Sequence, residues 1–124
     1  MTHEDKNLLM KDLCGRLPYE VKGFHRGEVQ RLLLMDSFGS YQVNGYDAWF
    51  NLNSVEFKPY LRPMSSMTKD EYKEYDEFEF ISASHFAHGI EAGELTDWLN
   101  AHHFDYRGLI GKGLALEAPE GMYN

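Results

Sequence analysis

Between residues 19 and 61 the chain alternates short apolar and aromatic segments with turn-forming residues, a spacing that leaves little room for a helix. The segments "YEVKGFH" and "EVQRLLLM" flank Gly27, and "DSFGS" then provides another turn. In "YQVNGYDAWF" the Asn-Gly pair tolerates the positive φ angles of a type I′ turn, which predicts antiparallel pairing of Tyr41–Val43 with Tyr46–Ala48. The region therefore predicts an antiparallel meander of four or five short strands.

The first eighteen residues, "MTHEDKNLLMKDLCGRLP", predict an amphipathic helix of about three turns. Thr2 can cap this helix, and Leu8, Leu9 and Leu13 fall on one stripe with Cys14 beside them. A glycine and a proline after the stripe end the helix. Because free cysteine is among the most buried residue types, we expect Cys14 in the core.

Two further helices are predicted in the second half of the chain. "KPYLRP" contains two prolines and marks the end of the sheet or an edge strand. Thr68 and Glu71 form a capping box before a helix whose apolar side would carry Tyr72, Tyr75 and Phe78. Where this helix ends stays open, because the alternation in "EFEFISAS" fits a returning strand equally well. "ELTDWLNAHHF" has the spacing of another helix.

These signals predict one α+β domain over residues 1–124, with an N-terminal helix, a small antiparallel meander and two or three C-terminal helices packed on one face. A chain of 124 residues that is 43% apolar can bury a core without help from metal or disulfide. The predicted core residues are Leu9, Leu13, Trp49, Trp98, Phe104, Leu109 and Leu114.

The glycine-rich stretch "RGLIGKG" near the C-terminus invites comparison with a phosphate-binding loop. That motif needs a hydroxyl residue directly after its lysine, whereas here Gly113 follows the lysine. We predict instead a short self-capped helix, with Asp105 at its N-cap and Gly113 just past its end. Leu109 would then be held between Phe104 and Leu114. The following "LALEAP" would add a strand or a packed arm, and no cofactor-binding residue is predicted.

Three blocks of the sequence, "EDKNLLMKDLCGRLPYEVK", "KPYLRPMSSMT" and "WLNAHHFDYRGLIGKGLALEAPEGMY", resemble the recurring blocks of a family of small proteins from gut anaerobic bacteria and their phages and mobile elements. The blocks cover nearly half of the chain. The resemblance implies a bacterial or phage-associated origin. It implies no activity, so it identifies no catalytic residue.

Several histidines suggest a metal site. His85, His88 and Glu91 are spaced three residues apart, which would place them on one side of a helix, and His102 and His103 lie nearby in sequence. Two glycines interrupt that helix, adjacent histidines point in different directions, and the spacing is not that of the H-E-x-x-H motif. We therefore predict no metal ligand and no catalytic residue.

The formal charge of −8 argues against broad affinity for nucleic acid or anionic lipid, since such binding needs clustered cations. Lys58, Tyr60 and Arg62 are a small exception and a candidate for local nucleic-acid contact. The chain contains no apolar run long enough to span a bilayer. A single cysteine and the lack of a signal-peptide pattern favour a reducing cytoplasm.

The segment "KDEYKEYDEFEF", residues 69–80, combines six acidic residues with four aromatic ones. Such a segment is most often a solvated helix face whose aromatic rings pack inward. A second interpretation is an acidic, aromatic surface that engages a basic partner protein by imitating the charge of nucleic acid.

The sequence favours a non-catalytic cytoplasmic binding or accessory protein, with another protein as its partner. One alternative is an acidic inhibitor of a host nucleic-acid-binding protein. Another is a small enzyme or metal-binding protein that uses His85 and His88. A deep pocket lined by several histidines or carboxylates would favour the enzyme, whereas a shallow surface with exposed aromatic residues would favour binding.

Overall fold

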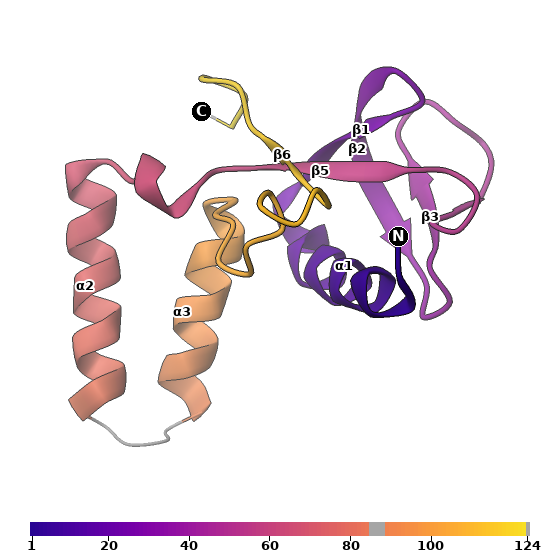
Figure 1. The fold of residues 1–124 in the computed structure, drawn as a ribbon. Helices are drawn as coiled ribbons and strands as arrows, with labels where there is room; N and C mark the ends of the chain where they lie inside the picture. The colour runs from indigo at the N-terminus through magenta and orange to yellow at the C-terminus, as the bar shows by residue number, and fades with distance from the viewer. Residues whose placement is uncertain (85–88, 124) are drawn as a thin grey trace.

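The computed structural model describes residues 1–84 and 89–123. Its centre is a six-stranded sheet in the order β4-β3-β2-β1-β5-β6, antiparallel except where β6 runs parallel to β5 (Figure 1). The helix α1 precedes the sheet, and the helices α2 and α3 follow the strand β5. This arrangement confirms the predicted α+β class.

Helix α1, His3–Arg16, begins at the predicted cap. The Thr2 hydroxyl accepts from the Asp5 amide at 3.0 Å, and the Asp5 carboxylate accepts from the Thr2 amide in return. Leu9 and Leu13 are buried where the helix lies along the sheet, beneath β5 in the view of Figure 1. The prediction for Cys14 is wrong, because its side chain lies on the exposed side of α1.

Strands β1, Lys22–His25, and β2, Glu28–Met35, form the predicted hairpin. Arg26 and Gly27 join them with φ angles of 50° and 85°, as a type I′ turn requires. The pairing of β2 with β3 then shifts register between Leu32 and Leu34, at a β-bulge.

Strand β3, Ser40–Val43, pairs with β4, Phe50–Asn51, and not with Tyr46–Ala48 as predicted. The chain does turn at Gly45, where φ is 92°. It then stays unpaired, because the rings of Tyr46 and Phe50 both pack against the buried His25, at centroid distances of 5.4 and 4.6 Å. Contacts with a distant strand thus override the local turn signal.

Strand β5, Phe57–Leu61, is an interior strand, so the prediction that "KPYLRP" marks a sheet end or edge is wrong. Pro59 lies opposite Gly23 of β1. Beyond it the Tyr123 hydroxyl accepts from the Lys22 amide at 3.0 Å and donates to the Tyr60 carbonyl at 2.7 Å. The C-terminal tyrosine therefore bridges the two strands where their ladder ends, and β6, Leu116–Glu117, supplies the strand expected in "LALEAP".

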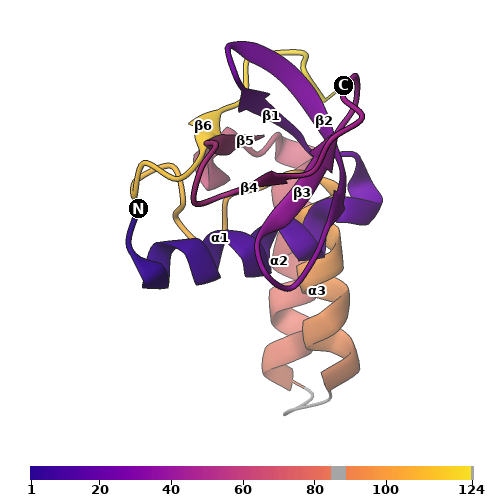
Figure 2. The same cartoon turned by 90° about the vertical axis from the view of Figure 1, so that its right-hand side faces the viewer.

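Helix α2, Lys69–Ser84, and helix α3, Gly89–Ala101, form a helical hairpin that projects away from the sheet, as Figures 1 and 2 both show. A short 3₁₀ turn, Met64–Ser66, leads into it. The segment "EFEFISAS" is helical, which decides the alternative left open by its alternating pattern. None of the described helices is long and apolar enough to cross a membrane.

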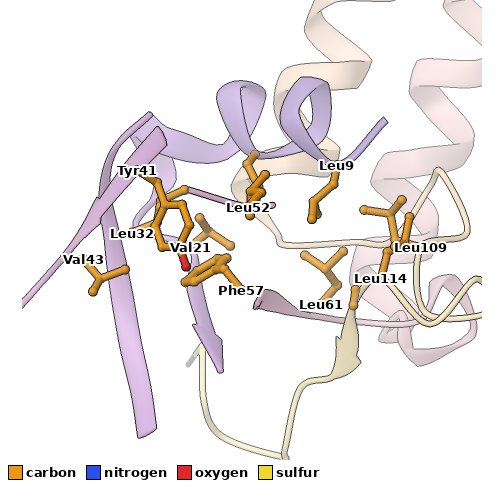
Figure 3. Packing of buried hydrophobic residues seen from close by; sticks show 12 residues of the cluster. Leu9, Val21, Leu32, Tyr41, Val43, Leu52, Phe57, Leu61, Leu109 and Leu114 are labelled. Carbon is orange, nitrogen blue, oxygen red and sulfur yellow. The ribbon is translucent and has the colours of Figure 1, made fainter. Parts of the chain in front are cut away.

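The core lies between α1, the sheet and the C-terminal segment. Figure 3 shows Leu9 of α1 close to Leu52 and Leu61, with Leu109 and Leu114 of the C-terminal segment beside them. Five predicted core residues are buried: Leu9, Leu13, Phe104, Leu109 and Leu114. Trp98 is half-buried. Trp49 is 52% exposed, because the next residue turns its ring onto His25 and leaves Trp49 facing water.

A buried ionic network ties α1 to the C-terminal segment. Asp12 and Arg16 are fully buried, and the Arg16 guanidinium donates to both oxygens of Asp12, at 2.7 and 3.1 Å. Arg16 also donates to the Phe104 carbonyl at 2.7 Å, and Arg107 donates to Asp12 at 2.7 Å. The first helix is thereby fixed to residues nearly a hundred positions away.

Candidate binding surfaces

The α2–α3 hairpin carries almost the whole net charge of the molecule. Residues 69–101 include nine acidic and two basic residues, a net charge of −7, whereas the remaining residues include eleven acidic and ten basic ones, a net charge of −1. Among the hairpin residues whose side chains the structure describes, the exposed acidic ones are Asp70, Glu74, Asp76, Glu77, Glu94 and Asp97. Charge is therefore segregated onto the part of the fold that projects from the sheet (Figure 1).

Aromatic rings fill the seam between the two helices. Trp98 of α3 faces Tyr75 and Phe78 of α2 at centroid distances of 6.3 and 6.0 Å. Its indole nitrogen donates to Glu74 at 2.8 Å. Tyr72, predicted on the apolar side, is instead 61% exposed, so the acidic surface of α2 also presents an aromatic ring.

The hairpin is anchored to the sheet through Arg62. Its guanidinium donates to both carboxylate oxygens of Glu71 at 2.7 Å and lies 4.3 Å from the centre of the Phe104 ring. Hydrogen bonds from Arg62, aided by the Thr68 amide and opposed by burial, lower the pKa of Glu71 to about 2. The predicted capping box is present as well, with the Glu71 amide donating to Thr68 at 3.1 Å.

This anchor changes the predicted basic patch of Lys58, Tyr60 and Arg62. Arg62 forms an ion pair with Glu71 and so does not present its charge to a ligand. The patch therefore does not form as predicted. Lys58 lies 3.0 Å from Glu56 in a surface ion pair. Neither the sequence spacing nor the residue types identify Glu71 as the partner of Arg62, because that contact depends on the direction in which α2 leaves the sheet.

The structure describes two of the four histidines that suggested a metal site, and these two contact different partners. His85 and His88 lie outside the described residues. The Nδ1–H group of His102 donates to the Trp98 carbonyl at 2.9 Å, and its ring lies against the Trp98 ring at a centroid distance of 4.3 Å and a tilt of 32°. His103 is buried and stacks on Tyr123 at 3.6 Å. Among the residues that the structure describes, no group of three histidine, cysteine or acidic side chains is arranged to hold a metal ion.

His103 gives the fold a pH dependence. Burial, together with the nearby Arg16 and Arg62, lowers the pKa of His103 to about 4, against 6.5 for an ordinary histidine. Between pH 6.5 and 4 this histidine is largely protonated in the unfolded chain and largely neutral in the folded chain. The free energy of unfolding therefore falls as the pH falls. The expected loss approaches about 3 kcal/mol at pH 4.

Urea denaturation between pH 6.5 and 4.5 measures this effect. His103→Asn is the matched variant, because His103 has a φ angle of 62° and asparagine tolerates that conformation. We expect a shallower pH dependence in the variant than in the wild type. Equal slopes in the two proteins would show that His103 titrates normally.

Cys14 is not activated as a nucleophile. Partial burial raises the pKa of its thiol, which reduces the fraction of reactive thiolate at neutral pH. The exposed position also removes the expected packing role of this residue. Cys14 therefore contributes neither to the core nor to a recognisable active site.

The glycine-rich segment serves the backbone, although without the predicted helix. The Asp105 carboxylate accepts from the Leu109 and Ile110 amides at 2.8 and 3.0 Å. Leu114 donates to the Leu109 carbonyl and Gly113 to the Ile110 carbonyl, which are the two bonds of a Schellman cap. Gly108 adopts a φ angle of 74° and converts the expected helix into consecutive turns.

A groove of about 540 Å³ lies between the start of α1, the loop before β5 and the turn at Gly113. Its floor is apolar, with Leu9, Leu52, Phe57 and Leu114. Its charged residues are Asp5, Glu56, Lys58 and Lys112, and no histidine lines it. Exposed aromatic residues lie elsewhere on the surface, at Phe24, Phe38, Trp49 and Tyr72.

Comparison of the chain with protein-family models, with curated proteins and with solved structures finds no match.

Proposed function

We propose that this protein is a non-catalytic accessory protein that binds a basic partner protein through the α2–α3 hairpin. The segregation of charge carries this proposal, because a net charge of −7 on a projecting helical hairpin creates a strong local field beside a nearly neutral body. The exposed ring of Tyr72 adds the apolar contact that electrostatic steering by itself lacks. A reducing cytoplasm suits the exposed thiol of Cys14.

Two charge-matched triple variants test the proposal. In the hairpin, Asp70→Asn, Asp76→Asn and Glu77→Gln remove three exposed charges, and elsewhere Asp47→Asn, Glu117→Gln and Glu120→Gln remove the same number. The probe is a fluorescein-labelled peptide of twenty residues rich in lysine and arginine. We expect the hairpin variant to weaken binding by about tenfold and the other variant by less than about twofold.

Equal weakening by the two triple variants would mean that the peptide senses only net charge, and the proposal would then fail. Tyr72→Ala provides a second comparison, since it leaves every charge in place. We expect it to increase the dissociation rate of the peptide and leave the salt dependence of association unchanged.

The same observation favours a more specific function, in which the basic partner is a nucleic-acid-binding protein and the hairpin occupies its phosphate-binding surface. Acidic side chains along a helix can present negative charge to cations that otherwise bind phosphates. The peptide titration tests this when repeated with duplex DNA bound to the peptide. The wild type should displace the DNA, and the hairpin triple variant should not.

A further inference from the structure

Six side chains form two cross-strand rows on the outer face of β5, β1 and β2, opposite the buried face that holds Gly23, His25 and Phe57. Phe24 lies opposite Val29 on one side and Lys58 on the other. In the next row Lys22 lies opposite Arg31. Tyr60 follows Lys58 on the same face of β5, where the Tyr123 hydroxyl bridges the backbones of Lys22 and Tyr60. The members of this outer patch are therefore Lys22, Phe24, Val29, Arg31, Lys58 and Tyr60. The patch contains three cations and no acidic residue.

Three members of the outer patch, Phe24, Val29 and Arg31, are exposed, and the other three are half-buried. Its composition is unfavourable for the stability of the sheet. Phe24 and Val29 are 41% and 50% exposed, although they sit on neighbouring strands. Lys22 and Arg31 are like charges placed directly opposite each other, an arrangement that destabilises a strand pair. A shallow hollow of about 410 Å³ lies beside them, lined by Lys22, Val29, Gln30, Arg31 and Asn44. These features point to a ligand.

The cations of the outer patch can exchange their present partners for an anionic ligand. Arg31 is 3.2 Å from Glu20, and Lys58 is 3.0 Å from Glu56, but both acidic partners are largely exposed. The Lys22 amine donates to the Met122 carbonyl at 3.3 Å and lies 5.9 Å from the centre of the Tyr123 ring. Surface pairs of this kind contribute little to stability, so a stronger anion can replace them.

The acidity of the whole chain does not oppose an anionic ligand here. Outside residues 69–101 the net charge is only −1, and the hairpin projects away from the sheet (Figure 1). At physiological salt, charges separated by more than about 8 Å of solvent are largely screened. The net charge of −8 is thus the sum of a strongly acidic hairpin and a nearly neutral remainder that carries the cationic outer patch.

We propose that the outer patch binds single-stranded nucleic acid. Lys22, Arg31 and Lys58 would contact phosphates, and the exposed ring of Phe24 would stack on a base. An aromatic ring flanked by cations on an open sheet suits a strand with unpaired bases, whereas a duplex hides its base faces. This inference concerns a different surface from the hairpin, so the two proposals can fail separately.

Fluorescence anisotropy with fluorescein-labelled oligo(dT) and oligo(rU) of twenty nucleotides tests the proposal between 50 and 200 mM salt. We expect binding at 50 mM, with a slope of log K against log salt of about −2, because three phosphates are contacted. Lys22→Gln with Arg31→Gln should weaken binding by at least about tenfold and bring the slope to about −0.7. Phe24→Ala should weaken it by about tenfold with no change of slope.

The matched control is Lys11→Gln with Lys112→Gln, which removes two exposed cations outside the outer patch. We expect this control to bind within about twofold of the wild type, and the hairpin triple variant to bind no more weakly than the wild type. Circular dichroism should show all variants folded.

The proposal is overturned if neither oligonucleotide binds at 50 mM salt. It is also overturned if the control weakens binding as much as the outer-patch variant, since that result would reduce the effect to net charge. Capture by the outer patch of an acidic peptide of alternating glutamate and phenylalanine, with no oligonucleotide binding, would assign the surface to a protein partner and overturn it as well.

Discussion

Replacing Asp12 with alanine is expected to lower the free energy of unfolding by about 3–5 kcal/mol. Among the described residues, Asp12 is the only carboxylate that forms an ion pair with the fully buried Arg16, and Arg107 reaches the same carboxylate from the C-terminal segment. Without it the Arg16 guanidinium would stay buried with only the Phe104 carbonyl as a hydrogen-bond acceptor. Urea denaturation at pH 7 measures the change.

The double variant Asp12→Leu with Arg16→Met is the informative control, because it removes the two fully buried charges with side chains of similar size. Arg107 loses its carboxylate but is partly exposed and keeps its hydrogen bond to the Tyr106 hydroxyl. We expect it to be more stable than Asp12→Ala, since replacing a whole buried pair costs far less than leaving one charge unpaired. A value for Asp12→Ala within about 1 kcal/mol of the wild type would show that the network does not hold α1 to the C-terminal segment.

The second large effect is expected at Gly23, where alanine should destabilise the protein by about 3 kcal/mol. A Cβ atom at this position would overlap Cζ of Phe57, and Phe57 is itself buried in the core. The sheet can relieve this overlap only by moving β5 away from β1 or by forcing the ring out of its rotamer.

Phe57→Leu should relieve the overlap, which makes the two sites testable as a cycle. We expect the destabilisation of the double variant to be smaller than the sum of the two single changes by at least about 1 kcal/mol. Thermal or urea denaturation of the four proteins provides the comparison. Strict additivity would contradict the close contact between Gly23 and the ring.

The features that could be predicted from the sequence are those fixed by neighbouring residues. The N-cap at Thr2 and the capping box at Thr68 depend on residues three positions apart, and the cap at Gly113 depends on amides within one turn. The hairpin at Gly27 likewise needs only two residues with positive φ. These features are predictable because the hydrogen bonds and turns that form them involve residues close together in the sequence.

The features that could not be predicted depend on partners far away in the chain. Trp49 faces water because its neighbour takes the place beside His25, and Cys14 is exposed because the contact surface of α1 passes through Asp12 and Arg16. The acidic character of residues 69–80 is plain in the sequence, yet its projection from the fold follows from the Arg62 anchor. The outer patch likewise requires the register of three strands.

The most direct test of the proposed function is a ¹⁵N NMR titration of the wild-type protein with the basic peptide. We expect chemical-shift changes to concentrate in α2 and α3. The indole signal of Trp98, whose nitrogen donates to Glu74, should move, and the amide signals of Phe24 and Arg31 should not. Shifts confined to the sheet or to the groove beside Gly113, with the hairpin signals unmoved, would contradict it.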